Sequence, residues 1–266
     1  MRPADRPTLL RYREGGLRPV EGEASRALLA ADSWLVADGA TRGRDRHWAR
    51  FESSAGELGA PRASLEGFRG AVESVLSDRG RWFPRVELVD GGHLQLRLRP
   101  APPPRAEARV LVGPPGDPRT RPLCKGPDLE LLLKLRARAV AADADELLLC
   151  DDDGRLLEGA LSALLWWEQD ALCTTPSDRT LPSVTRELLL QIARERGARV
   201  AVRSPPPSEL CGCEVWLVNA AHGIQVVTAW DGRPAAPAPR AEDWRAALEA
   251  TARRPLAADS SRRRLP

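Results

Sequence analysis

The sequence predicts an α+β protein with two domains, each built around a β-sheet of its own. Segments with the apolar spacing of a helix are interspersed with short segments that alternate like strands. The proline-rich segment PAPPPR at 100–105 interrupts this order, and such segments stop sheets and often link domains. We therefore expect a smaller N-terminal domain over 1–104 and a larger C-terminal domain over 107–266.

The N-terminal half shows strand, helix and hairpin patterns in turn. DSWLVADGA at 32–40 is typical of a strand that ends in an Asp-Gly turn. Apolar residues at helical spacing predict helices over 45–58 and 64–76. Two alternating runs, RVELV and HLQLRLR, flank Asp90-Gly91-Gly92 and predict a hairpin.

The C-terminal half opens with a strand and a helix. We expect a strand at 107–113, a helix from about 128 to 142, a strand at 145–150 and one long apolar strand region at 156–167. A later helix begins at an N-cap, Ser183, and closes at Gly197. The runs ARVAVR and EVWLVNA predict further strands, and EDWRAALEATARR predicts a final helix.

Composition excludes several classes of protein. The chain has 266 residues, a net charge of +3 and 42% apolar residues, which suits a globular protein and gives no electrostatic case for nucleic acid. It has no apolar run of about 18 residues that would cross a membrane. Five scattered cysteines predict a reducing cytoplasm. Three histidines and a single C-x-C pair make a metal site improbable.

Lysine is almost absent from a chain rich in arginine. The two lysines, Lys125 and Lys134, both lie within RTRPLCKGPDLELLLKLRARAV. Guanidinium stays protonated, whereas an amine can lose its proton and attack a carbonyl. One of these lysines is therefore a candidate nucleophile, although a solvated lysine is the ordinary explanation.

Four more features suit one ligand. Glu158 lies in an apolar strand, where a carboxylate is costly without a cationic partner. LPSVTR at 181–186 is a helix N-terminus that can bind phosphate, Arg50 can add a bidentate grip, and VNAAHGI at 218–224 ends a strand in small residues. Each also has a structural explanation: a surface carboxylate, a helix cap, an ion pair or a loop. Together they describe a site for an aldehyde with a pyridine nitrogen and a phosphate, pyridoxal 5′-phosphate.

The order of these motifs resembles the fold-type IV pyridoxal-phosphate family. That family holds the branched-chain and D-amino-acid aminotransferases and aminodeoxychorismate lyase. The resemblance covers about 32–231 and is strongest from Lys125 to Arg186, where lysine, helix, Ala-Asp-Glu, strand, Asp-Gly turn, Glu-Gly and Thr-Arg follow in the family's order. It implies the two-domain architecture of D-amino-acid aminotransferase, with the cofactor between the domains, and a homodimer.

The resemblance also implies a role for each site residue. Lys125 would form the Schiff base and carry protons, and Glu158 would pair with the pyridine nitrogen. The remaining cofactor-binding residues would be Arg50, Val184, Thr185, Asn219 and Ala220. Ser33 or Trp34 would lie on the substrate side. His222, beside the proposed phosphate strand, is a further substrate candidate, with a structural loop histidine as the alternative.

Three functions remain open at this point. The first is a lyase of the aminodeoxychorismate type, which releases pyruvate and leaves an aromatic amine. The second is an aminotransferase for an amino acid and a 2-oxo acid, because the same lysine and glutamate serve both reactions. The third is a non-catalytic descendant of the fold that acts as a partner protein.

Overall fold

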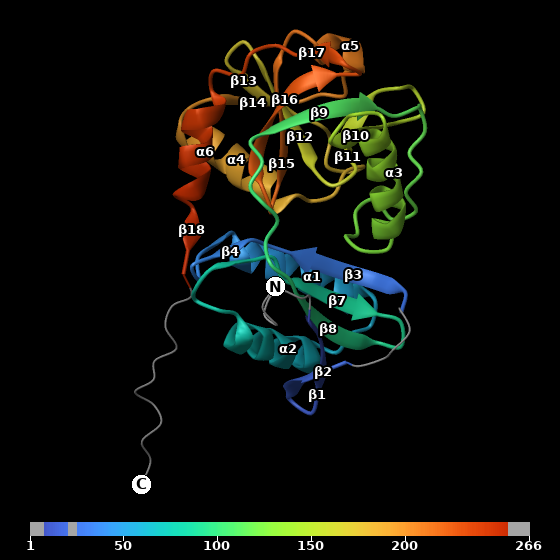
Figure 1. Cartoon of the computed structure of the whole chain (residues 1–266), viewed down its shortest axis with the longest axis vertical. Coiled ribbons are helices and arrows are strands. Elements are labelled where there is room, and N and C mark those ends of the chain that lie inside the picture. Colours follow the sequence, from blue (N-terminus) through green and yellow to red (C-terminus); the bar gives the residue numbers. More distant parts are fainter. Residues whose placement is uncertain (1–7, 21–25, 255–266) are drawn as a thin grey trace.

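The computed structural model of the chain describes residues 8–20 and 26–254, so the predicted domain ends at 1–7 and 255–266 lie outside the described residues. The chain forms an N-terminal and a C-terminal lobe (Figure 1). The N-terminal lobe contains a five-stranded antiparallel sheet in the order β2-β1-β8-β7-β3. Its strands are β1 (Thr8–Arg13), β2 (Gly16–Pro19), β3 (Leu28–Ser33), β7 (Arg85–Val89) and β8 (His93–Leu98).

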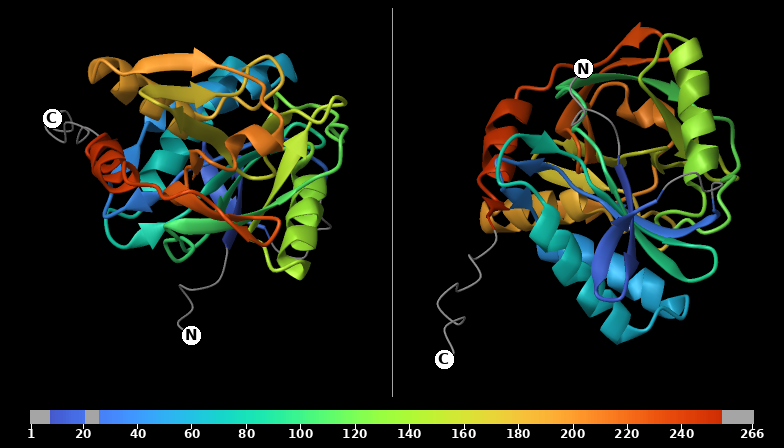
Figure 2. Two further views of the ribbon diagram at one scale, coloured as in Figure 1. Left: turned by 90° about the horizontal axis from the view of Figure 1, so that it is seen from above. Right: turned by 60° about the horizontal axis from the view of Figure 1, so that its bottom comes forward.

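Two helices, α1 (Arg44–Glu57) and α2 (Arg62–Val75), cover one face of this sheet (Figure 2). Their apolar stripes meet the sheet in one core, in which Trp48, Phe51 and Phe68 contact one another through their rings. The other face of the sheet points toward the C-terminal lobe. There, strand β3 and the residue after β8, Arg99, contribute to the site described below.

The C-terminal lobe contains a nine-stranded mixed sheet. Its order is β11-β10-β9-β16-β15-β12-β13-β14, with β17 paired to β16. The strands are β9 (Glu107–Val112), β10 (Glu146–Cys150), β11 (Leu156–Gly159), β12 (Ala163–Glu168), β13 (Ala171–Thr174), β14 (Arg199–Val202), β15 (Glu214–Asn219), β16 (Gly223–Trp230) and β17 (Arg233–Pro234). Since β9 pairs in parallel with both β10 and β16, it lies inside the sheet and carries the chain in from the N-terminal lobe.

Helices pack on this sheet at both ends. Helix α3 (Leu129–Ala141) packs on β10, while α4 (Val184–Glu195) and α6 (Ala241–Glu249) share a core with β12 and β15. A short helix, α5 (Pro207–Leu210), follows β14. None of the helices in the described ranges has the length and apolar character needed to span a membrane.

Four two-residue strands form two further pairs. β4 (Val36–Ala37) pairs with β6 (Arg81–Trp82) inside the N-terminal lobe. β18 (Ala252–Arg253), which follows α6, pairs with β5 (Thr41–Arg42) of the N-terminal lobe. The chain therefore returns to the N-terminal lobe after the C-terminal one is complete, so this contact joins the two predicted domains, 1–104 and 107–266.

The predicted elements largely coincide with the observed ones, with four corrections. The strand predicted at 32–40 is not one strand: β3 already ends at Ser33, and only Val36–Ala37 of the remainder form a strand, β4. The region 156–167 is two strands, because Gly159 to Ser162 form a turn between β11 and β12. The final helix ends at Glu249, and the residues after it form β18. The sequence reading missed β1 and β2, in which an arginine at an inward position, Arg11, is 2% exposed and breaks the apolar alternation.

Candidate active site

A cavity of about 610 Å³ lies where the two lobes face each other. It is lined by β3, α1, the loop before α3, the end of β11, the start of α4 and the β15–β16 turn. The predicted site residues that line it are Ser33, Arg50, Lys125, Glu158, Val184, Thr185, Asn219, Ala220 and His222.

Trp34 is the one predicted site residue that the structure does not bring to the cavity. Its side chain is fully buried in the N-terminal core, 5.3 Å from the ring of Trp48 and 5.9 Å from that of His47. Neighbouring residues of extended chain point in opposite directions, so Ser33 faces the cavity while Trp34 faces the helices. The expectation that Trp34 lies on the substrate side is therefore corrected.

Lys125 is presented by a short loop that is fixed at both ends. The carboxylate of Asp128 accepts hydrogen bonds from the backbone N–H of Thr120 at 3.0 Å and of Arg121 at 2.8 Å. The Lys125 carbonyl accepts a 2.6 Å hydrogen bond from the N–H of Ala31 on β3. Gly126, with φ of 138°, lies so close that an added Cβ would be 2.9 Å from the Ala30 Cα, so only glycine fits beside this contact.

The amine of Lys125 has a lowered pKa. Burial, with the nearby Arg50 guanidinium, lowers its pKa to about 8 from the usual 10.5, against the opposing effect of Asp32 and Glu158. Within the described residues, the amine has no hydrogen-bond or ion-pair partner. Lys134, in contrast, is an exposed side chain whose amine pairs with Glu130 at 2.6 Å. The structure thus separates the two lysines: Lys125 is available for chemistry and Lys134 is solvated.

Glu158 lies in the cavity wall at the end of β11, nearly inaccessible to water. Its Oε1 accepts a hydrogen bond from the N–H of Leu181 at 2.8 Å and an ion-paired one from Arg119. Burial raises the pKa of the Glu158 carboxyl, and Arg119, Leu181 and Arg186 oppose that rise. Both hydrogen bonds to Glu158 use Oε1, so Oε2 has no partner among the described residues.

The N-terminus of α4 presents donors to the same cavity. Ser183 caps the helix by accepting from the N–H of Arg186 at 3.3 Å. The N–H groups of Val184 and Thr185 have no partner in the part of the chain that the structure describes, as is usual in a first helical turn. Such a terminus binds anions, above all phosphate.

Arg50 lies beside that helix N-terminus and is held by a group that sequence reasoning missed. Its Nη1 donates to the carbonyl of Pro182 at 2.6 Å, and its Nε and Nη2 donate to the carboxylate of Asp32 at 2.7 and 2.9 Å. Asp32 also accepts from Nδ1 of His47 at 2.8 Å, which requires the Nδ1–H tautomer. A charged residue within the apolar run LLAADSW was the available signal.

The β15–β16 turn closes the cavity on a third side. The side-chain oxygen of Asn219 accepts from the N–H groups of Ala221 and His222 at 3.0 and 2.8 Å, and the Ala220 carbonyl accepts from Arg42 at 2.9 Å. Nδ1 of His222 is buried with no partner in the described part of the chain. Burial and the nearby arginines, Arg105 first, lower the pKa of His222, so its ring is neutral.

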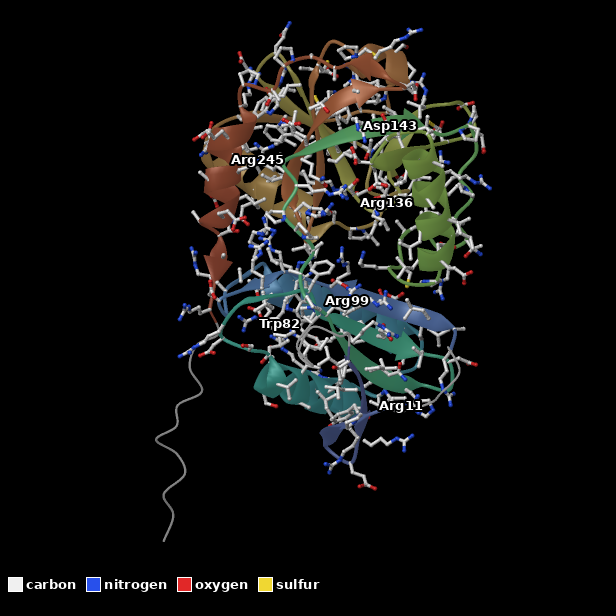
Figure 3. The ribbon with its side chains drawn as sticks, viewed as in Figure 1. Arg11, Trp82, Arg99, Arg136, Asp143 and Arg245 are labelled. Atoms are coloured by element: carbon white, nitrogen blue, oxygen red, sulfur yellow. The ribbon has the colours of Figure 1, made fainter. Side chains whose placement is uncertain are left out.

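The cavity carries more positive than negative charge. Arg99, Arg121 and Arg136 line it and pair with no carboxylate of the described residues. Figure 3 labels Arg99 on the N-terminal lobe and Arg136 on the C-terminal lobe. Arg99 donates to the hydroxyl of Ser33 at 3.4 Å, and burial with the neighbouring arginines lowers its pKa to about 10. An anionic ligand at this wall would stabilise the Arg99 charge.

A comparison with family models decides the family. The model of the class IV aminotransferases matches residues 29–230. The chain belongs to the class IV aminotransferase family. This confirms the predicted membership of the fold-type IV pyridoxal-phosphate enzymes and with it the α+β fold class.

Solved structures of class IV aminotransferases share the fold. A fold IV transaminase from Curtobacterium pusillum is 22% identical, with a TM-score of 0.76 over 92% of this chain and 97% of that one. A hypothetical aminotransferase from Mycobacterium tuberculosis, bound to α-ketoglutarate and PMP, is 20% identical with a TM-score of 0.80 over 92% and 98%. A putative branched-chain amino acid aminotransferase from Thermotoga maritima is 18% identical, with a TM-score of 0.75 over 91% and 95%. A search of curated proteins found no match.

As a class IV aminotransferase family member, the chain is a pyridoxal-phosphate-dependent enzyme, and its cavity residues suit that cofactor. An unpartnered amine with a lowered pKa at Lys125 suits the aldehyde. Oε2 of Glu158 and the N–H groups of Val184 and Thr185 have no partner within residues 8–20 and 26–254. Oε2 suits the pyridine nitrogen, and the N–H groups, with Arg50 beside them, suit the phosphate.

The lowered pKa of Lys125 predicts how cofactor uptake depends on pH. Only the neutral amine attacks an aldehyde, so the rate at which the apoprotein takes up pyridoxal phosphate should rise about tenfold per pH unit below 8 and level off above it. Stopped-flow absorbance from pH 6 to 9.5 measures this, with Nα-acetyllysine as the control whose rate keeps rising. A rate that also rises through pH 9.5 in the protein would show that Lys125 has an ordinary pKa.

Proposed function

We propose that this chain is an aminotransferase that moves an amino group between an amino acid and a 2-oxo acid. The observation that carries the proposal is the meeting of Lys125, Glu158 and the α4 N-terminus in one cavity of a class IV aminotransferase. The cofactor, when bound, supplies an electron sink for the carbanion that forms when the substrate loses its α-proton.

The protein residues would divide the remaining tasks. Lys125, neutral above about pH 8, would take the proton from the substrate Cα and would return it at the C4′ carbon of the cofactor. Glu158, fixed through Oε1, would hold a proton on the ring nitrogen with Oε2. Arg50, Val184 and Thr185 would bind the phosphate, and Asn219 and Ala220 would close the cup around it.

The substrate carboxylate would bind at the wall of the cavity that the N-terminal lobe forms. Arg99, which pairs with no carboxylate within the described residues, points its Nη2 at the Ser33 hydroxyl, and both line the cavity. A guanidinium in such a place is a preferred carboxylate ligand. His222, with its neutral ring, would contact the opposite part of the substrate.

A single-turnover experiment tests this function. Reconstituted protein mixed with one amino-acid donor at a time should lose the visible absorbance of the cofactor, release one equivalent of 2-oxo acid and regain its colour when a 2-oxo acid is added. Pyruvate released from aminodeoxychorismate with no such bleaching would favour the lyase instead, for which the unpaired arginines would hold two carboxylates. A colourless protein that ignores added cofactor would favour the non-catalytic alternative.

We further propose that the enzyme acts as a homodimer in the cytoplasm. Leu123 and Leu133 are each 47% exposed, on the loop that carries Lys125 and on α3, and Leu133 lines the cavity. Exposed leucines beside a ligand cavity are typical of a surface that a second subunit covers. Light scattering that gives the mass of one chain at micromolar concentration would contradict the dimer.

A further inference from the structure

We propose that Asp117 and Arg119 form a buried charge pair that positions Glu158 and keeps it anionic opposite the ring nitrogen of the cofactor. Arg119 and Asp117 are positioning residues in this proposal, because they act through Glu158. The inference rests on the proposed cofactor site and adds to it the group that controls the charge of its key carboxylate.

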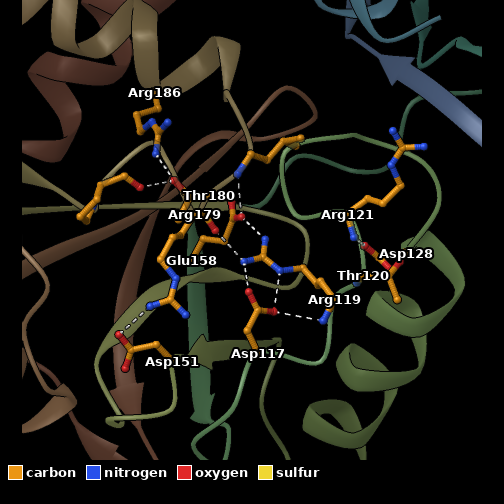
Figure 4. A network of polar contacts seen from close by, with 12 residues as sticks. Asp117, Arg119, Thr120, Arg121, Asp128, Asp151, Glu158, Arg179, Thr180 and Arg186 are labelled. Carbon is orange, nitrogen blue, oxygen red and sulfur yellow. Dashed lines mark hydrogen bonds and ion pairs between the residues drawn. The ribbon is translucent and has the colours of Figure 1, made fainter. Parts of the chain in front are cut away.

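Arg119 is held almost entirely away from water, and its donors are shared between two carboxylates (Figure 4). Nε and Nη2 donate to the two oxygens of Asp117 at 2.9 and 2.8 Å. Nη1 donates to Oε1 of Glu158. The planar guanidinium fixes these directions relative to each other, so the bidentate contact with Asp117 determines where Nη1 meets Glu158.

The same guanidinium joins three segments of the site. Arg119 directly precedes the loop that carries Lys125. The next two residues, Thr120 and Arg121, donate their backbone N–H groups to Asp128, which fixes that loop. Nη2 of Arg119 also donates to the carbonyl of Arg179 at 3.0 Å. Two residues later, the N–H of Leu181 donates to Glu158 just before the α4 N-terminus. A displacement of Arg119 would therefore change the positions of Lys125, Glu158 and the α4 N-terminus relative to one another.

The charges explain why Asp117 is needed. Within the hydrogen-bonded group of Asp117, Arg119 and Glu158, two carboxylates and one guanidinium leave one negative charge in excess, which the nearby charges of Arg186 and Lys125 offset in part. A protonated pyridine nitrogen opposite Oε2 would balance that charge. Without Asp117, Arg119 would neutralise Glu158 by itself, and the carboxylate would be a weaker partner for a cationic ring.

The pH dependence follows from the groups that face Glu158. Burial raises the pKa of its carboxyl; Arg119 is the first group to oppose that rise, followed by Leu181 and Arg186. Lys125 faces it across the cavity. When Arg119 is replaced by a neutral residue, the largest opposing charge is lost, so the pKa of Glu158 rises further and its carboxyl becomes a poorer partner for a charged ring nitrogen.

The test uses the holoenzyme and the variant Arg119→Gln. We expect kcat/KM to fall by at least about tenfold at pH 7 and to recover to within about threefold of the wild type at pH 9, as Glu158 loses its proton again. The visible absorbance of the bound cofactor should likewise differ from that of the wild type at pH 7 and return toward it at pH 9. Arg119→Lys keeps the charge but lacks the planar fork, so it should lower the rate by a factor that does not depend on pH.

A matched control and a double variant separate positioning from simple structure. Arg179→Gln changes an arginine of the same network whose side chain pairs with Asp151 and does not reach Glu158, so its pH profile should match the wild type. In the Glu158→Gln background, adding Arg119→Gln should change the rate by less than about threefold, because one residue acts through the other.

Two outcomes would overturn the inference. The first is an active Arg119→Gln enzyme whose pH profile and cofactor spectrum equal those of the wild type. The second is a double variant, Glu158→Gln with Arg119→Gln, whose loss of rate equals the product of the two single losses. A wild-type protein that takes up no pyridoxal phosphate at all would instead contradict the cofactor site itself. Circular dichroism and cofactor affinity of Arg119→Gln show whether a loss comes from unfolding. In that case Asp117→Asn is the second variant: with Arg119 left to neutralise Glu158, cofactor affinity should fall at every pH without recovery at pH 9, and a wild-type cofactor affinity would overturn the inference.

Discussion

Replacing Lys125 with alanine is expected to lower kcat by at least about 10⁴-fold, because the amine is both the attachment point and the proton carrier. The fold should survive. The side chain lines a cavity, its amine has no partner among the described residues, and its loop is held by backbone contacts that alanine keeps. The measurement is turnover together with mass mapping of the peptide that borohydride links to the cofactor.

Lys134→Ala is the matched control for this prediction. Lys134 is exposed and pairs with Glu130 one helical turn away, and solvent screens such a surface contact. Its activity and its labelled peptide should therefore equal those of the wild type. A label on Lys134, or full activity in Lys125→Ala, would reverse the assignment of the two lysines.

Replacing Asp32 with asparagine is expected to lower the free energy of unfolding by about 3–5 kcal/mol, because Arg50 would lose its buried counter-charge. Asp32 is fully buried and accepts hydrogen bonds from Arg50, His47 and the N–H of Ser33. Urea unfolding of the apoprotein at pH 7 measures the loss. Cofactor affinity should fall as well, since Arg50 would no longer be held beside the α4 N-terminus.

The sign of the pH dependence adds a second check on Asp32. Burial opposes ionisation, but Arg50 and His47 outweigh it and hold the pKa of Asp32 below its usual range. Its stabilising effect is therefore present above the ordinary carboxyl pKa of 3.8 and is lost as pH falls below it. The variant should lack this component of acid unfolding.

Asp45→Asn is the control for Asp32. Asp45 pairs with Arg69 at 2.6 Å on the surface, with 87% of its side chain exposed. An exposed pair of this kind contributes about 0–1 kcal/mol, so the variant should unfold almost like the wild type. Equal stabilities for Asp32→Asn and Asp45→Asn would show that the buried cluster does not hold the N-terminal lobe.

Local pattern determined most of the secondary structure of this protein. Helical spacing placed α1, α2, α3 and α4 to within two residues of their observed ends, because an apolar stripe must face a core whatever that core contains. The error at 156–167 has the same origin, since both strands and the turn between them are buried and their composition is continuous. The scarcity of lysine singled out Lys125, since the chemistry of an amine is a property of the residue type itself.

Tertiary structure alone decided which charged groups act together. Trp34 and Ser33 are neighbours in sequence, yet only the packing of β3 against α1 placed one in the core and the other in the cavity. Asp117 and Arg119 carry no local signal of a site, and the charge of Asp32 within an apolar run does not identify its partners, because those partners lie up to dozens of residues away. The energy of a charged group depends on its burial and on its distance to other charges, and both are set only when the chain has folded.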